Sequence, residues 1–355
     1  MRKTRLCSVL AAVLAAAISV NSHAAPKTDF SVCWTIYAGW MPWEYGAASG
    51  IVDKWAKKYG INIDVVQIND YVESINQYSA SQFDGCTMTN MDALTIPAAG
   101  GVDSTALIIG DFSNGNDGVV LKGEKKTLGD LKGQNVNLVE LSVSHYLLAR
   151  GLEKSGLSEK DLNVVNTSDA DLVAAFATSD VTAVTTWNPL LAEIEATPGV
   201  TKVFDSSQIP GEIIDLMVVN SDTLKDNPAF GKALTGAWYE IMATMSADTP
   251  AGIAAREHMA KASGTDLAGY EAQLAATKMF YSAKDAVDFA NSTKLPATMN
   301  KVAEFSFSHG LLGEGAKSSD AIGMGFAKGI TTGDQGNLKL RFDPSYMQMA
   351  ADGTL

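Results

Sequence analysis

The chain has 355 residues, 46% of them hydrophobic, and a formal net charge of −13 at neutral pH. This acidity argues against nucleic acid or anionic lipid as a partner, because both are bound through clustered lysine and arginine. The length is sufficient for two domains with sizeable cores.

Residues 1–24 have the pattern of a secretory signal peptide. A basic start precedes a short apolar run, small residues follow at Ser22 and Ala24, and cleavage is expected before Ala25. The apolar run is shorter than the roughly 20 residues of a membrane span. We therefore expect a soluble protein exported to the periplasm.

Strand-like runs alternate with helical segments from residue 31 onward. The runs are SVCWTIY (31–37), INIDVVQI (61–68), FDGCTMT (83–89) and STALIIGD (104–111), with helices expected near 44–59 and 70–80 and from residue 91. Strands separated by helices of this length predict parallel βαβ units with helices on both faces of the sheet.

A second series of strands begins near residue 118. Its strand-like runs are GVVLK, NVNLVEL, LNVVN, VTAVTTW and TKVFD, with helices expected near 144–155, 169–178 and 188–196. IIDLMVVN (213–220) is a further strand, after which the chain is expected to be helical almost to its end. Within that part, residues 228–245 carry an apolar stripe with helical spacing.

The second series is predicted to be inserted into the first. We expect a first lobe at 25–117, an inserted lobe at 118–215, and a return to the first lobe with C-terminal helices at 216–355. The crossing segments DFSNGNDG and GEIIDLMVVN contain Gly, Asn and Ser, which suit a bending backbone. Two α/β lobes joined by two hinge strands are typical of binding proteins that close over a ligand.

Two cysteines, Cys33 and Cys86, remain after removal of the signal peptide. In an oxidising compartment they could form one bridge, and they could equally be two buried thiols. The residues alone leave both alternatives open.

Ligands in open parallel sheets bind beyond the carboxyl ends of the strands. This rule selects six stretches, none of which contains a lysine or an arginine: YAGWMPWEYG, DGCTMTNMDALT, DFSNGNDG, LVELSVSHY, VTTWNPLL and VFDSSQIPGEIID. They contain nine carboxylates, at positions 44, 84, 92, 111, 117, 140, 205, 212 and 215. Carboxylates beside aromatics predict a pocket for a small cation or a neutral molecule rich in hydrogen-bond donors.

Most of these positions also have a purely structural interpretation. Trp40 and Trp43 could plug the top of a domain, and Glu44 could favour the start of a helix. The others are polar residues at expected helix starts, which could act as caps, and a tryptophan at a strand end: Asn90, Asp92, Ser142, Ser144 and Trp187. Asp215 interrupts an apolar run and must find a partner.

Signals for an enzyme are weak. The three histidines beyond the signal peptide match no metal spacing, and no nucleophile elbow or phosphate-binding loop occurs. We expect no catalytic residue, no cofactor and no metal.

The order of motifs resembles the nitrate/taurine-type (NitT/TauT) binding proteins of ABC transporters. The resemblance covers roughly residues 30–245. It rests on the aromatic turn after the first strand, on TLGDLKG followed by a strand and a polar turn, and on the Trp-Asn-Pro end of a later strand. It implies a type II periplasmic binding protein, a monomer that delivers a small-molecule ligand to an ABC permease.

Within that family the chain is similar to a branch associated with urea transport and urea carboxylase-type enzymes, which implies guanidine or urea as the ligand. The family's contacts map onto the turns that hold Trp43 and Glu44, Asn90 and Asp92, and Ser142, Ser144 and His145. Our full set of predicted ligand-binding residues adds Trp40, Glu140, Trp187 and Asp215. If Cys33 and Cys86 lie on neighbouring strands, as the family's strand order implies, a bridge can form.

Three alternatives stay open at this stage. The ligand could be an aliphatic sulfonate or another small anion, as in other branches of the family, although Glu44 and Glu140 depart from those branches. The chain could be a pyrimidine-synthase-like enzyme on the same fold, which would need a reactive histidine or cysteine in the cleft. It could also be a sensor that feeds a signalling receptor.

Overall fold

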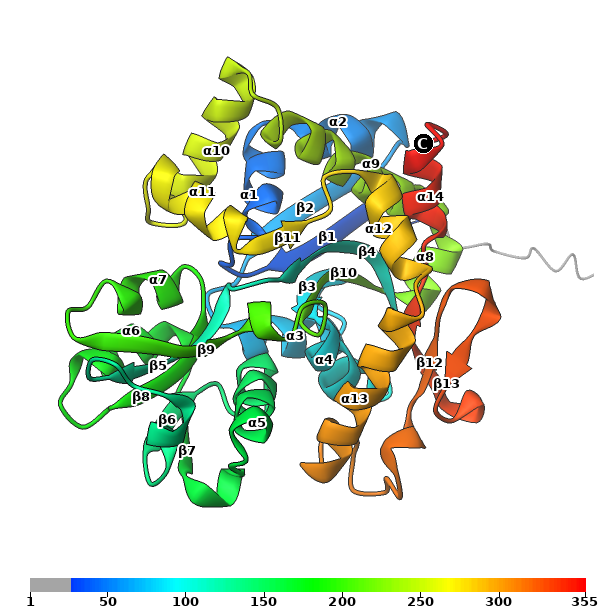
Figure 1. Cartoon of the computed structure of the whole chain (residues 1–355). Helices are drawn as coiled ribbons and strands as arrows, with labels where there is room; N and C mark the ends of the chain where they lie inside the picture. Colours follow the sequence, from blue (N-terminus) through cyan, green and yellow to red (C-terminus); the bar gives the residue numbers. More distant parts are fainter. Residues whose placement is uncertain (1–26) are drawn as a thin grey trace, which may run out of the picture.

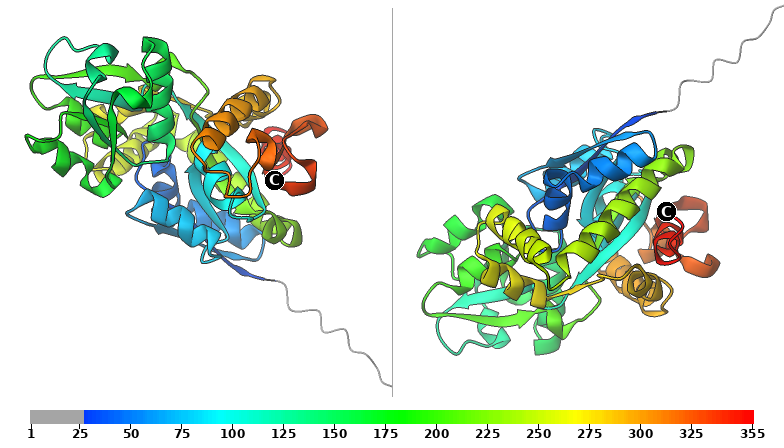
Figure 2. Two further views of the ribbon diagram at one scale, coloured as in Figure 1. Left: turned by 90° about the horizontal axis from the view of Figure 1, so that it is seen from below. Right: turned by 90° about the horizontal axis from the view of Figure 1, so that it is seen from above.

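The computed structural model describes residues 27–355, so the predicted signal peptide lies outside the described residues. The strands form two mixed sheets. Figure 1 shows the second sheet with α5, α6 and α7 at the lower left, and the first sheet with the remaining helices filling the rest of the molecule. Figure 2 shows the same two masses from above and below.

The first sheet has nine strands in the order β13-β12-β14-β4-β10-β3-β1-β2, with β11 paired to β4 outside that path. Their bounds are β1 (Asp29–Trp34), β2 (Asn62–Gln67), β3 (Gly85–Thr89), β4 (Ser104–Ser113), β10 (Ile214–Asn220), β11 (Thr277–Met279), β12 (Gly323–Gly325), β13 (Thr331–Thr332) and β14 (Leu338–Phe342). β1 is parallel to β2 and β3, whereas β10 is antiparallel to both β3 and β4.

The second sheet has five strands in the order β7-β6-β8-β5-β9. Their bounds are β5 (Asp117–Lys122), β6 (Asn135–Leu138), β7 (Asn163–Asn166), β8 (Ala183–Trp187) and β9 (Val200–Asp205). β6 is parallel to β7 and β8, and β5 is antiparallel to β8 and β9.

Helices cover both sheets. Those of the second sheet are α5 (Val143–Ser155), α6 (Asp169–Ala177) and α7 (Leu190–Glu195). The others are α1 (Met41–Ala48), α2 (Ile51–Lys58), α3 (Tyr71–Ser79), α4 (Asn90–Ala93), α8 (Ser221–Asp226), α9 (Pro228–Met245), α10 (Pro250–Ala262), α11 (Leu267–Ala275), α12 (Ala283–Ala290), α13 (Lys294–Ser308) and α14 (Ser345–Ala351). None of the helices formed by residues 27–355 combines the length and the apolarity that crossing a membrane requires.

The chain crosses between the sheets twice, from β4 to β5 and from β9 to β10. The crossings are hydrogen-bonded to each other: Ser113 Oγ lies 2.6 Å from Ser206 Oγ, which also accepts from the Gly115 N–H at 2.7 Å. The two crossings therefore lie side by side.

Three predictions about the elements are wrong in detail. The single helix predicted at 44–59 is two helices, because Gly50 takes a left-handed conformation (φ 76°) between α1 and α2. The sheets are mixed rather than parallel, because both strands that lead across, β5 and β10, run against their neighbours. The C-terminal part contains β11–β14, each of two to five residues, which is too short to show periodicity.

Cys33 and Cys86 are joined by a disulfide, with their Cα atoms 4.4 Å apart. They occupy paired positions on the parallel neighbours β1 and β3. Of the two alternatives that the sequence left open, the structure shows the bridge.

Candidate functional site

A narrow cavity lies between the two sheets, next to the crossings. It is lined by Tyr37, Trp40, Tyr71, Thr89, Asp117, Val143, Trp187, Ile213 and Asp215. Most of these residues stand at the ends of strands or at the start of the helix that follows.

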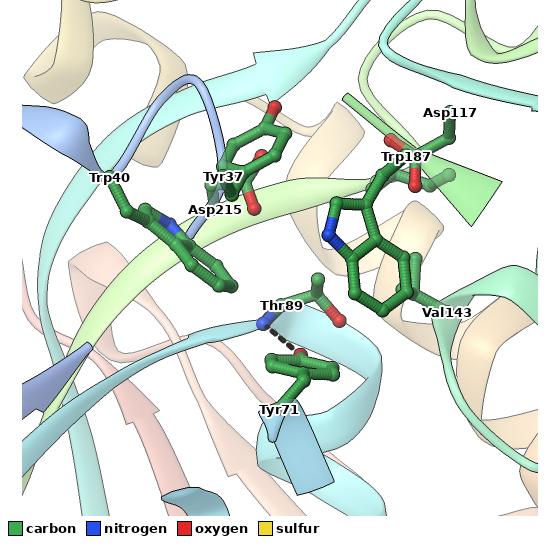
Figure 3. A pocket seen from close by; sticks show the side chains of 9 residues that line it. Tyr37, Trp40, Tyr71, Thr89, Asp117, Val143, Trp187 and Asp215 are labelled. Carbon is green, nitrogen blue, oxygen red and sulfur yellow. Dashed lines mark hydrogen bonds between the residues drawn. The ribbon is translucent and has the colours of Figure 1, made fainter. Parts of the chain in front are cut away.

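Aromatic rings form the walls of the cavity. Trp40 lies 5.7 Å from Tyr71 and Tyr71 lies 5.5 Å from Trp187, measured between ring centroids, and Tyr37 meets Trp40 edge-on at 5.1 Å. Figure 3 shows Trp40 and Trp187 on opposite sides, with Tyr71 below and Asp215 between the two indoles. The indole Nε1 of Trp40 is buried without a hydrogen-bond partner. Aromatic rings from both sheets therefore meet at this cavity.

The loop that carries Trp40 approaches β4 closely at Gly39. A Cβ atom at this position would lie 2.5 Å from Asp111 Oδ2 and 2.7 Å from the ring of Tyr37. Glycine is therefore required by space. The absence of a side chain at residue 39 places the aromatic loop directly over the Asp111 carboxylate.

The cavity is acidic. Asp117 and Asp215 are each 3% exposed, and Asp111, directly behind Asp215, is fully buried. Burial raises the pKa of Asp117 and of Asp111 to about 7. Burial, together with the negative charge of Asp111, raises the pKa of Asp215 well above its usual value. No lysine, arginine or histidine of the described residues lines this cavity.

Asp92 stands behind the aromatic wall and holds two of its residues in place. Its Oδ2 accepts hydrogen bonds from the hydroxyls of Tyr71 and Thr89, each at 2.7 Å. Burial raises the pKa of Asp92 to about 6, against the opposing effect of these hydrogen bonds. Asp92 thus fixes the position of the Tyr71 ring without lining the cavity.

Three of the predicted ligand-binding residues line this cavity: Trp40, Trp187 and Asp215. The turn between β1 and α1 therefore contributes Trp40 to the cavity lining, and Trp43 is not part of it. Trp43 is 1% exposed and stacks on Trp238 of α9 with ring centroids 5.1 Å apart. Trp43 is a core residue in this structure.

Glu44 lies away from this cavity, and its role in ligand binding stays a prediction. Its Oε2 is 2.8 Å from His258 Nε2 of α10. The physical reason is the helical period: α1 already begins at Met41, so Trp43 and Glu44 lie within its first turn and face α9 and α10 rather than the strand ends.

The remaining predicted residues support the backbone around the cavity. Asn90 accepts from the Ile214 N–H at 2.9 Å and so ties α4 to the start of β10. Ser142 caps α5 by accepting from the N–H of Ser144, which is itself buried. Glu140 is exposed. None of these side chains lines the cavity.

The cavity lining also includes four residues that were not among the predicted ones: Tyr37, Tyr71, Thr89 and Asp117. Asp117 and Thr89 lie in stretches selected by the strand-end rule, where other residues were preferred. Tyr71 follows β2, the one strand of the first series whose carboxyl end was not included. Consistent use of the rule at every strand would have found it.

The structure brings together His145 and His309, which are far apart in sequence. Glu159 lies between them, with its Oε2 3.4 Å from His145 Nε2 and its Oε1 2.9 Å from His309 Nε2. His145 Nδ1 accepts from the Leu141 N–H, so its Nε2 carries the hydrogen and offers no lone pair to a metal. We therefore interpret this group as a hydrogen-bonded link between α5 and α13.

Solved structures identify the class of protein that the two linked sheets represent. The periplasmic aliphatic sulphonate binding protein SsuA from Escherichia coli matches with a TM-score of 0.66 and 19% identity, over 83% of this chain and 96% of that one. The periplasmic nitrate-binding protein NrtA from Synechocystis PCC 6803 matches with a TM-score of 0.57 and 13% identity, over 93% of this chain and 100% of that one. The fold is that of a periplasmic binding protein, as predicted.

The chain belongs to the NMT1/THI5-like family, whose model matches residues 54–248, more than half of its length. A candidate binding protein of Brucella abortus (strain 2308) is 28% identical over 139 residues, which are 38% of this chain. The chain spans 43% of the length of that relative. That relative is described as a binding protein, and guanidine or urea as the ligand of this chain stays a prediction.

Proposed function

We propose that this chain is a periplasmic solute-binding protein for a small planar cation, with guanidinium as the type ligand, which it delivers to an ABC permease. One observation carries the proposal: Asp117 and Asp215 meet in a cavity walled by aromatic rings, with no basic side chain in its lining. Residues 118–215 form one lobe in this proposal and the rest of the mature chain forms the other, and the two lobes close over the ligand.

The physical chemistry of the cavity favours a cation. A guanidinium ion donates pairs of parallel N–H groups to a carboxylate, and its flat face stacks on an indole. Buried carboxylates without a counter-charge are costly, and a bound cation supplies that charge. An anion would meet Asp117 and Asp215 and find no basic side chain to pair with. Urea, with the same shape but no charge, keeps the hydrogen bonds and loses the ionic attraction.

A second candidate function is the binding of an aliphatic sulfonate, because SsuA has the same fold. The enzyme alternative loses its candidate thiol, because Cys86 is bonded to Cys33. The first alternative differs from our proposal in the charge of the ligand. The second differs in that the ligand would be chemically converted.

Isothermal titration calorimetry of the mature protein at pH 7.5 with guanidinium chloride, urea, taurine and sodium nitrate separates them. We expect guanidinium to bind most tightly, urea at least tenfold more weakly, and neither anion to bind measurably. Tighter binding of taurine or nitrate would refute the cation proposal. Turnover of guanidinium, followed by NMR, would show an enzyme.

Matched variants locate the site. Trp187→Ala removes one aromatic wall and should weaken both guanidinium and urea, by on the order of tenfold for a loss of about 1–2 kcal/mol of stacking. Glu44→Gln serves as the control, because Glu44 contacts His258 outside the cavity lining, and it should leave both affinities unchanged. If Glu44→Gln weakened guanidinium selectively, the ligand would instead lie at the outer end of α1.

A further inference from the structure

Asp111 and Asp215 form a carboxyl pair behind the cavity. They occupy directly paired positions on the antiparallel strands β4 and β10, so their side chains lie on the same face of the sheet. Asp215 lines the cavity, whereas Asp111 does not. The Oδ2 atom of each is buried without a hydrogen-bond partner, and the charge of Asp111 acts on Asp215. Two buried carboxyl groups that face each other can be joined by a hydrogen bond only if one of them holds a proton.

The groups that face this pair offer no positive charge. From the loop before α1, the Tyr37 hydroxyl donates to Asp111 Oδ1 at 3.3 Å. From β5, Asp117 adds a third buried carboxylate, which also faces Asp92 of α4. From α11 and the chain after β11, Tyr270 and Tyr281 are near Asp111, and both are neutral.

A basic group near Tyr281 has partners of its own. Arg256, beside Tyr281, pairs with Glu271 and donates to the Met245 carbonyl oxygen. Three carboxylates in one desolvated space cannot all be ionised without a cation, because each charge raises the free energy of the next. The empty site therefore keeps at least one proton on the carboxyl pair.

We propose that ligand binding at this site is an exchange: the cation enters beside Asp215, and the proton shared by Asp111 and Asp215 leaves to the solvent. This inference rests on the proposed function. The reaction balances as protonated protein plus cation giving complex plus one proton, with no change of net charge in the cavity. Asp111 acts through Asp215 and is a positioning residue that holds the exchangeable proton.

The exchange has a definite pH dependence. Where one proton leaves for each cation bound, the association constant rises tenfold per pH unit. Burial raises the pKa of Asp111 to about 7 in the empty protein, and a bound cation lowers it because it favours the carboxylate. Asp215, whose pKa is raised well above its usual value, keeps a proton after Asp111 has ionised, so affinity should rise with pH as long as the empty pair holds a proton. An anionic ligand would do the opposite and take up a proton, because protonated carboxyls are the groups that could donate to it.

The test is calorimetry of guanidinium chloride binding to the mature protein at pH 6.0 in phosphate and in ACES, two buffers with different enthalpies of ionisation. The dependence of the observed enthalpy on the buffer enthalpy gives the number of protons released. We expect a value of at least one at pH 6.0, with affinity rising at least tenfold from pH 5.5 to 6.5. Confirmed binding without proton release, or with proton uptake, overturns the exchange and leaves the cation site in place. Absence of guanidinium binding overturns both.

A variant pair tests the assignment to Asp111. Asp111→Asn removes the shared proton but lies outside the cavity lining, so it should bind guanidinium with little proton release and a flattened pH profile. Asp64→Asn, at an exposed position on β2, should keep the wild-type profile. A full proton release in folded Asp111→Asn protein would overturn the role of Asp111. If that variant does not fold, the wild-type proton count decides the proposal.

Discussion

Two buried acidic sites lie between the sheets, and they are built in opposite ways. At Glu212, on the crossing before β10, every oxygen has a partner: Tyr146 and Arg150 of α5 donate to it at 2.7 and 2.8 Å, and Lys301 of α13 donates at 2.9 Å. At Asp215, three residues further on, the neighbours are other carboxyl groups and a tyrosine.

The pKa shifts of the two acids follow from this difference. Burial alone would raise the pKa of Glu212, but hydrogen bonds from Arg150, Tyr146 and Lys301 outweigh it and lower the pKa. Burial and the charge of Asp111 both raise the pKa of Asp215. A buried acid that comes with its own bases is structural, and it links α5 to α13. A buried acid without basic partners obtains a counter-charge only when a cation binds.

Removing the charge of Glu212 should give the largest effect on stability. Glu212→Gln leaves Arg150 without its main partner, and we expect the free energy of unfolding to fall by about 2–3 kcal/mol, below the range for fully buried pairs because Arg150 and Lys301 are partly exposed. Urea denaturation measures it. Glu153→Gln, which removes an exposed partner of the same arginine, should cost less than about 1 kcal/mol. Equal costs would mean that the Glu212 link is no stronger than a surface pair.

Replacing Asp215 by its amide should instead raise the free energy of unfolding of the unliganded protein. Asp215 keeps its proton at a pH where the unfolded chain has released it, so folding costs free energy there. Asp215→Asn should raise the free energy of unfolding at pH 8 by about 1–2 kcal/mol and weaken guanidinium binding at least tenfold. Urea denaturation without ligand and calorimetry with it check the two parts. A variant that loses stability as well as binding would make Asp215 a structural residue like Glu212.

Some elements of the fold and some residues of the site can be predicted from the sequence. The sequence predicts β1, β3 and the apolar helix α9 correctly, because each carries a clear pattern over several residues. The strand-end rule also selected the stretches that hold Trp40, Asp117, Trp187 and Asp215. The absence of lysine and arginine from those stretches indicates an acidic site from the sequence alone.

What the sequence could not show is which way a side chain points. The choice between Trp40 and Trp43 depends on where α1 begins, and helix starts are uncertain by a few residues. The β11–β14 strands are too short for a pattern, and the bases of Glu212 come from helices more than 60 residues away in sequence. Whether an acid has a counter-charge is decided by tertiary contacts of this kind.

A further prediction concerns Asp117 and the pH dependence of stability, where a smaller effect is expected. The pKa of Asp117 is raised by burial to about 7, so between about pH 4 and 7 the unfolded chain holds fewer protons than the folded one and stability falls as pH rises. Asp117→Asn removes this loss, so its stability relative to wild type should increase from pH 4.5 to 5.5 by about 1 kcal/mol. Thermal unfolding without ligand at several pH values measures the difference. A difference that stays constant with pH would mean that Asp117 is ionised in the folded protein throughout.

The smallest effect is expected at the Glu159 link between α5 and α13, where the acid again has its own partners. Hydrogen bonds from His145 and His309 lower the pKa of Glu159 against the opposing effect of burial. Its contribution should therefore be present above the pKa of the unfolded chain and lost as pH falls through the lowered value. Glu159 is about one-third exposed, so Glu159→Gln should cost only about 0.5–1 kcal/mol at pH 7, and progressively less as the pH falls through the lowered pKa. Thermal unfolding at pH 7 and at acidic pH tests this, with Glu140→Gln as an exposed control on the same lobe. A cost that persists at low pH would show that Glu159 acts there by packing rather than by charge, and the contrast between paired and unpaired acids would then rest on Glu212 and Asp215 alone.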